Sequence, residues 1–304
     1  MADHVDHAHE RKIPARGVPV KPYMSERSFF DVETLFGSDY LVTMKILVCI
    51  KQVPDSAESL AVDEGTGVLS CLPSTVFRMN RFDEFALEEA LLIREHLPGT
   101  RVDVLSLGPE RVSAGIQRAL GMGADHGIHI LDRTEGYVSP FTVASLIAAC
   151  VAARNYELIM TGVMAEDTLA AQTGQLIAAL LDLPCATSVI QEDLRPERGE
   201  ILVEREIEGG SRQTKLLKLP AVLTIQPGIN LPRYPSFSKV MRAQTYPQEL
   251  IGADGLAIPE PREARRGVRI PEAAAPGVFL EGSPREKARK LIGILHEKSL
   301  LSRA

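Results

Sequence analysis

The sequence predicts an α/β fold in which a parallel sheet carries helices on both faces. Two observations lead to this prediction. Short, buried, β-branched runs alternate with longer amphipathic segments from about residue 45 to residue 181, which is the pattern of βαβ units. With 304 residues, of which 45% are hydrophobic, the chain is also long enough to bury a large core without disulfides.

The first half of the chain predicts four buried strands and four helices in alternation. Continuous apolar runs predict strands over residues 46–53, 102–107, 127–131 and 158–161. Helical periodicity predicts helices over residues 83–95, 112–120, 140–154 and 170–181, and residues 63–67 (DEGTG) predict a turn. Asn80 and Asp83 are suitable caps for the first of these helices.

After Pro184 the rhythm changes to shorter strands separated by polar turns. We expect strands over residues 186–192, 201–207, 214–218 and 221–225. These strands predict an antiparallel or mixed extension of the sheet.

Composition divides the chain into three parts. Residues 1–43 carry seven acidic residues and the histidines His4, His7 and His9, and we expect an extension that is poorly ordered and solvated. Residues 44–258 form the predicted nucleotide-binding α/β domain. Residues 1–258, which are this domain and the extension together, carry a net charge of −10. Residues 259–304 form a proline-rich arm of net charge +4, whose Ser283-Pro284 pair predicts the start of an amphipathic helix. A partner subunit is the natural surface for this helix, and a fold-back onto its own domain is the alternative.

Several classes of protein and site are excluded or disfavoured. No apolar run reaches the ~20 residues that span a bilayer, so the chain is not membrane-embedded. The acidic balance argues against nucleic-acid binding. The four cysteines (Cys49, Cys71, Cys150 and Cys185) show no metal-ligand spacing, so we expect no bound metal. We expect the cysteines to be reduced, which indicates a cytoplasmic compartment. The sequence contains no convincing catalytic constellation.

The candidate site lies where the parallel strands end, because open α/β sheets bind ligands beyond the carboxyl ends of their strands. The loop that begins at Gly162 follows a strand and opens a helix, and its Thr168, Gln172 and Thr173 add polar groups. Free amides at a helix N-terminus favour anions, so this loop predicts a phosphate or nucleotide site, with an ordinary capped turn as the alternative. The glycines Gly121, Gly123 and Gly127 follow a helix and precede a strand, the reverse of a dinucleotide fingerprint, and predict a helix-ending turn instead.

Seven segments, in order, carry a family resemblance. They are KILVCIKQVP (45–54), MNRFDEFALEEA (79–90), ALGMGAD (119–125), QTGQ (172–175), VEREIEGG (203–210), LPAVLT (219–224) and PRYPSFSKVMRA (232–243). Together they resemble the β subunit of electron transfer flavoprotein. The resemblance implies a Rossmann-like, adenine nucleotide α-hydrolase-like fold and a heterodimer with an α subunit that holds most of the FAD. It also implies a structural AMP on this subunit, acyl-CoA dehydrogenases as electron donors, and a quinone-linked or iron–sulfur oxidoreductase as acceptor.

The resemblance further implies roles for particular residues. The AMP-contacting residues would be Cys49, Asn80, Arg81, Phe82, Asp83, Leu107, Gly162, Val163, Met164, Ala165, Glu166, Asp167, Thr168, Leu169, Ala170, Ala171, Gln172 and Thr173. The loop 230–242 would dock the dehydrogenase, with Phe237 as the apolar anchor beside Tyr234 and Met241. Glu206 would contact the mobile flavin domain, and Arg205 would help to position that contact.

Three alternatives stay open at this point. A flavin-bifurcating relative would hold a second FAD in the AMP position, although the Thr173-Gly-Gln175 sequence favours AMP. A stand-alone adenine-nucleotide sensor on the same fold would form a homodimer and need no flavoprotein partner. A nicotinamide-dependent dehydrogenase is disfavoured because the glycine pattern is misplaced.

Overall fold

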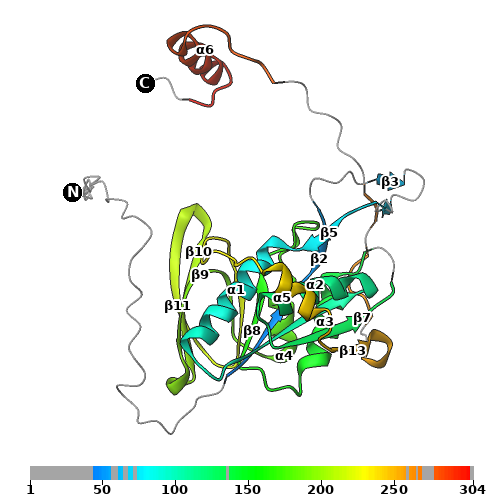
Figure 1. The fold of residues 1–304 in the computed structure, drawn as a ribbon. Helices are drawn as coiled ribbons and strands as arrows, with labels where there is room; N and C mark the ends of the chain where they lie inside the picture. The colour runs from blue at the N-terminus through cyan, green and yellow to red at the C-terminus, as the bar shows by residue number, and fades with distance from the viewer. Residues whose placement is uncertain are drawn as a thin grey trace, which may run out of the picture. The chain divides into compact units, whose positions relative to one another are not determined.

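A nine-stranded sheet organises residues 44–257 in the computed structural model (Figure 1). The structure describes residues 44–55, 61–63, 68–70, 74–134, 137–257, 260–264, 266–268 and 277–301. The expected N-terminal extension, Cys71 and the boundary at 258–259 lie outside these residues. The division into three parts therefore stays a prediction.

Seven neighbouring strands of the sheet are parallel, and two antiparallel strands extend one edge. The strands are β1 (Lys45–Cys49), β6 (Arg101–Gly108), β7 (His126–Leu131), β8 (Leu158–Gly162), β9 (Cys185–Arg195), β10 (Glu200–Ile207), β11 (Ser211–Lys218), β12 (Ala221–Ile225) and β13 (Gln248–Gly252). Their order is β11-β10-β9-β12-β8-β1-β6-β7-β13, and only the β9–β10 and β10–β11 pairs are antiparallel. The predicted α/β class and mixed extension are confirmed, although β9 and β12 belong to the parallel part.

Side chains alternate between the two faces of the sheet and build a separate apolar core on each. In β1, Ile46 and Val48 pack into the core under α1 (Arg81–His96) and α2 (Ser113–Met122). Leu47 and Cys49 pack into the opposite core, under α3 (Pro140–Val151) and α4 (Thr173–Leu181). A strand buried on both faces is apolar throughout, which explains why β1 reads as a continuous hydrophobic run.

The predicted strand over 46–53 is wrong in its second half. β1 ends at Cys49, and residues Gln52–Pro54 form a separate strand, β2, which pairs antiparallel with β5 (Phe77–Met79). Apolarity alone did not reveal this break, since Ile50 and Val53 are both buried after the chain has left the sheet. Around the predicted 63–67 turn, β3 (Ala61–Asp63) and β4 (Val68–Ser70) form a small antiparallel pair.

All four predicted helices are present, but two of them start and two of them end at least two residues away from the prediction: α2 runs two residues further, to Met122, and α3 ends three residues early, at Val151. Helix α1 begins at Arg81, two residues early, and α4 begins at Thr173 and not at residue 170. The glycine-rich turn is confirmed as the end of α2, because Gly123 has φ +132° and caps that helix. Short 3-10 turns lie at Glu110–Val112 (η2), Pro196–Arg198 (η3), Glu208–Gly210 (η4) and Ala253–Gly255 (η5).

Two elements after residue 230 were not predicted. Helix α5 (Phe237–Ala243) lies within the expected docking loop, and β13 adds the last parallel strand beside β7. Both are short, α5 is largely exposed and β13 has no fully buried residue, so neither shows a strong apolar period.

The predicted helix of the arm is present as α6 (Pro284–Glu297). Ser283 accepts a hydrogen bond from the Glu286 amide, and the Glu286 carboxylate accepts one from the Ser283 amide, which completes a capping box. In the part of the chain that the structure describes, no helix has the length and apolarity to cross a membrane.

Candidate functional site

A cleft opens at the carboxyl ends of β1, β6 and β8, where the sequence places its candidate loops. Its walls come from these strand ends, the start of α1, the start of α3 and the segment that leads into α4. The lining residues are Cys49, Ile50, Lys51, Asn80, Asp83, Leu105, Leu107, Tyr137, Val138, Pro140, Val143, Ile147, Thr161, Gly162, Val163, Met164, Ala165, Thr168, Ala170, Ala171, Gln172, Thr173 and Gly174.

Asp83 joins two strand ends at the floor of the cleft. Its carboxylate accepts hydrogen bonds from the backbone amides of Lys51 at 2.7 Å and Gly162 at 3.0 Å. Burial raises the pKa of Asp83 to about 7, and the two amide hydrogen bonds oppose that rise. A Cβ on Gly162 would lie 2.6 Å from both Asp83 and Phe82, so only glycine fits this approach.

Asn80 ties the start of α1 to the loop after β8. Its side-chain amide donates to the Met164 carbonyl at 2.9 Å, and its side-chain oxygen accepts from the Glu166 amide at 3.1 Å. Asn80 precedes the first residue of α1 as expected, but it makes no side-chain capping bond to that helix. The predicted cap is thus a cross-link between two segments that are more than eighty residues apart in sequence.

Ion pairs at the rim engage the two acidic residues of the loop. Asp167 accepts a hydrogen bond from Lys51 Nζ at 2.7 Å, and Glu166 pairs with Arg78 at 2.9 Å. Glu166 also accepts from the Arg81 amide at 3.2 Å. These carboxylates therefore hold the loop against the segment between β1 and β2, against β5 and against the start of α1.

The backbone between residue 169 and α4 adopts a left-handed path. Leu169 and Ala171 both have φ +51°, although neither is glycine. Gln172 then precedes α4 without making a side-chain capping bond, and Gly174 approaches Thr161 and Thr224 so closely that a Cβ would clash with both. Thr173 and Gly174, the first residues of α4, line the cleft, and a helix N-terminus favours an anion.

Most of the predicted nucleotide residues line this cleft. Thirteen do so: Cys49, Asn80, Asp83, Leu107, Gly162, Val163, Met164, Ala165, Thr168, Ala170, Ala171, Gln172 and Thr173. Arg81, Phe82, Glu166, Asp167 and Leu169 belong to the same loops but do not line it. Leu169 is 63% exposed, whereas Phe82 lies against Gly162.

Sequence reasoning missed the wall contributed by the third strand–helix unit. Tyr137, Val138, Pro140, Val143 and Ile147 close the cleft from the start of α3. The signal was available, since Ser139-Pro140 follows a predicted strand and marks a helix start at the same sheet edge. Lys51, directly after β1, was missed in the same way.

Of the free cysteines that the structure describes, Cys49 lines the cleft and Cys150 and Cys185 do not. Cys49, Cys150 and Cys185 are free, and burial raises the pKa of each. No group of three His, Cys, Asp or Glu side chains within the described residues could hold a metal ion.

The predicted docking residues form an exposed apolar patch on and before α5. Tyr234 is 86% exposed and Phe237 is 81% exposed, while Met241 is exposed on the following turn. The Arg118 guanidinium lies 5.0 Å from the centre of the Tyr234 ring. We call Tyr234, Phe237 and Met241 the docking patch.

Arg205 and Glu206 lie near the end of β10. Arg205 donates to the Thr187 carbonyl at 3.0 Å and to its hydroxyl at 2.7 Å, which fixes it against β9. Glu206 accepts a hydrogen bond from Gln226 at 3.4 Å.

Comparison with known proteins adds an independent line of evidence. Residues 69–254 match the family described as "Electron transfer flavoprotein domain". The chain is 31% identical to the electron transfer flavoprotein subunit beta of Methylophilus methylotrophus over 84% of its own length and 98% of that protein. It is 36% identical to the Bradyrhizobium diazoefficiens protein of the same name over 76% of this chain and 95% of that one. The pig (Sus scrofa) protein is 36% identical over 72% of this chain and 85% of that one.

Proposed function

Because the chain belongs to the electron transfer flavoprotein β-subunit family, we propose that it forms a heterodimer with an α subunit and carries electrons without a substrate of its own. In this role an acyl-CoA dehydrogenase supplies the electrons, and a quinone-linked or iron–sulfur oxidoreductase receives them. FAD, bound mainly by the α subunit, supplies the redox chemistry. The observation that carries the proposal is the cleft built from the candidate loops of a chain that belongs to this family.

AMP is the ligand that we propose for the cleft. The first amides of α4, with the hydroxyls of Thr168 and Thr173, suit a phosphate. The apolar side chains of Leu107, Val143 and Val163 suit a purine ring. Asp83 and Asn80 do not need to reach the ligand, because they hold the loops that do.

The remaining cofactor-site residues would then support the cleft from outside. Glu166 and Asp167 hold the loop through Arg78 and Lys51, and Phe82 packs beneath Gly162. Arg81 contributes its backbone amide to Glu166.

We assign partner contacts to three surfaces. The basic arm with α6 would lie on the α subunit, since Leu291 and Ile292 are about half exposed on a well-capped helix. Glu206 would contact the flavin domain, with Arg205 holding the strand end in place. The docking patch would enter an apolar pocket of the dehydrogenase, as exposed aromatic anchors commonly do.

Free buried thiols support a cytoplasmic location.

The deciding experiment is to co-express the chain with an α subunit from the same organism and to count bound nucleotides. We expect one heterodimer with one FAD and one AMP, identified by mass spectrometry after the protein is denatured. Two FAD and no AMP would replace this proposal with a bifurcating subunit. A homodimer that holds an adenine nucleotide and recruits no flavin would replace it with a stand-alone sensor.

A further inference from the structure

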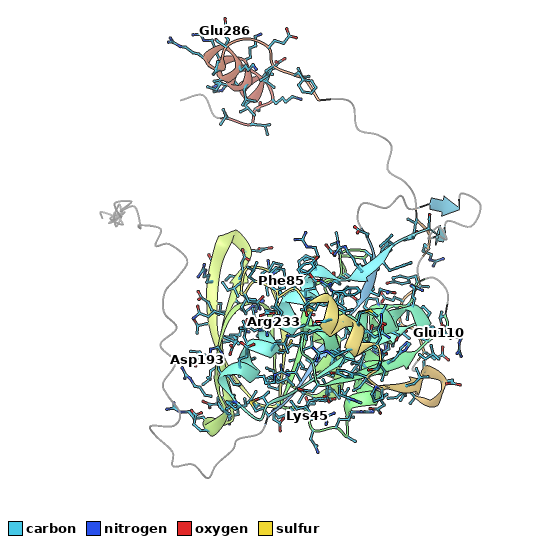
Figure 2. All side chains as sticks on the ribbon, viewed as in Figure 1. Lys45, Phe85, Glu110, Asp193, Arg233 and Glu286 are labelled. Atoms are coloured by element: carbon cyan, nitrogen blue, oxygen red, sulfur yellow. The ribbon has the colours of Figure 1, made fainter. Side chains whose placement is uncertain are left out.

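Carboxylates on α1 accept hydrogen bonds from residues 230 and 233, in the segment that precedes the docking patch. Arg233 donates from Nη2 and Nε to the two oxygens of Glu88, at 2.8 Å and 2.9 Å. Its Nη1 donates to Glu95 at 2.7 Å, and its backbone amide donates to Glu88 at 3.0 Å. In the view of Figure 2, Arg233 projects onto α1, the helix that carries Glu88 and Glu95.

This ion pair is partly buried and tightly directed. The Glu88 side chain is 5% exposed and that of Arg233 is 32% exposed. Hydrogen bonding to Glu88 raises the pKa of Arg233, and hydrogen bonding to Arg233 lowers the pKa of Glu95. A two-point guanidinium–carboxylate contact fixes direction as well as distance, which a single surface pair does not.

Further contacts hold the same segment on both sides of Arg233. Asn230 donates from Nδ2 to the Phe85 carbonyl at 2.9 Å and to Glu89 at 2.8 Å. On the far side, Arg118 lies over Tyr234 and pairs with Glu84 at 3.0 Å. The exposed aromatic side chains therefore stand on a backbone that is clamped to α1 and α2.

We propose that Arg233 is a positioning residue that holds the docking patch in the conformation the dehydrogenase binds. This inference rests on the docking function proposed above. Arg233 directly precedes the patch in sequence and acts through Glu88 and Glu95. A segment that reaches its binding conformation only part of the time loses apparent affinity by that fraction.

The test uses the intact heterodimer as the electron acceptor of an acyl-CoA dehydrogenase from the same organism. Arg233→Gln should raise KM for the heterodimer by about tenfold with little change in kcat, because docking is impaired and electron transfer within the docked complex is not. Arg233→Lys keeps the charge but loses the fork, and should raise KM by about threefold. Amide exchange should speed up across residues 230–241 in Arg233→Gln but not in the central strands.

Two other variants make the result specific. Phe237→Ala should raise KM as strongly without changing amide exchange at residue 233. Arg133→Gln breaks an ion pair with Glu110 that is exposed on both sides, and it should change neither KM nor exchange.

The outcomes separate the two proposals. If Phe237→Ala raises KM while Arg233→Gln and Glu88→Gln leave it at the wild-type value, the positioning role is overturned and the docking function stands. If Phe237→Ala leaves KM unchanged, the docking function is overturned and the positioning role with it. The double variant Arg233→Gln/Glu88→Gln should have a KM no higher than Arg233→Gln alone, since both residues belong to one contact. Additive increases would overturn the idea that Arg233 acts through Glu88.

Discussion

The carboxylate of Asp83 accepts a hydrogen bond from the backbone amide of Gly162, which lies 79 residues later in the chain, at 3.0 Å. The same carboxylate accepts a hydrogen bond from the amide of Lys51, two residues after the end of β1. One buried side chain at the start of α1 therefore sets the spacing of two adjacent strand ends, and with it the width of the cleft.

Asp83 predicts a pH-dependent term in stability. Its pKa is raised from 3.8 to about 7 in the folded chain, so the folded state retains the proton longer than the unfolded state does. The stability that this group contributes is full below pH 3.8 and is lost as the pH rises through 7. Urea unfolding should show that the difference in unfolding free energy between wild type and Asp83→Asn becomes smaller as the pH rises from 3.8 to about 7. A gap that stays constant with pH would contradict the assignment.

Glu249 predicts the opposite dependence at the far end of the sheet. It accepts hydrogen bonds from Arg154 at 2.6 Å and 2.8 Å and contacts His126 at 3.2 Å, and these partners lower its pKa from 4.5 to about 2. Its contribution is present above pH 4.5 and is lost as the pH falls through 2.

Glu249→Gln should cost about 1 kcal/mol at neutral pH, because solvent screens a pair that is one-third exposed. When unfolding is measured at decreasing pH, the unfolding free energies of Glu249→Gln and wild type should become equal near pH 2. The control is Glu110→Gln, whose exposed pair with Arg133 should produce no comparable convergence.

Gly162→Ala should damage the cleft. The added methyl would lie 2.6 Å from the Phe82 backbone, which cannot move without shifting the start of α1. We expect a loss of about 1–3 kcal/mol in unfolding free energy and weaker nucleotide retention on gel filtration.

Gly115→Ala supplies the matched control, since nothing lies within 4 Å of its new Cβ in α2. That variant should be unchanged or more stable, by up to about 1 kcal/mol. Equal effects at Gly162 and Gly115 would show that the close approach does not matter.

Ser283→Ala should loosen the arm helix. The substitution removes one half of the capping box and leaves an amide of the first turn without its partner. A cap is worth about 1 kcal/mol, so amide exchange across 284–297 in the full chain should speed up by about fivefold. Ser236→Ala, at the start of α5, removes no capping bond and should leave that helix unchanged.

The sequence predicts most clearly those elements whose burial imposes a period. Val102, Val104 and Leu105 are buried in β6, and the strand was predicted within one residue at each end. β13 was not predicted because it is an edge strand, and its residues Gln248 and Glu249 contact polar partners. α5 escaped because only Ala243 of its seven residues is buried.

The site was predictable as a set of loops but not as a set of contacts. Strand ends and a helix start placed the cleft, because parallel topology brings them to one edge. The pairing of Lys51 with Asp167, and of Asn80 with Met164, depends on how loops from different units meet. No local pattern in the sequence contains that information.

The strand order also governs how the domain is made. The central strands β8, β1, β6 and β7 are complete by residue 162, but β12 and β13, which cover their two outer edges, end only at residues 225 and 252. A growing chain therefore leaves the ribosome with four paired strands and two open edges, and such edges are templates for association with other chains. Nascent chains should need chaperone protection until β13 has emerged, and chains truncated before residue 248 should aggregate and not form a smaller folded domain.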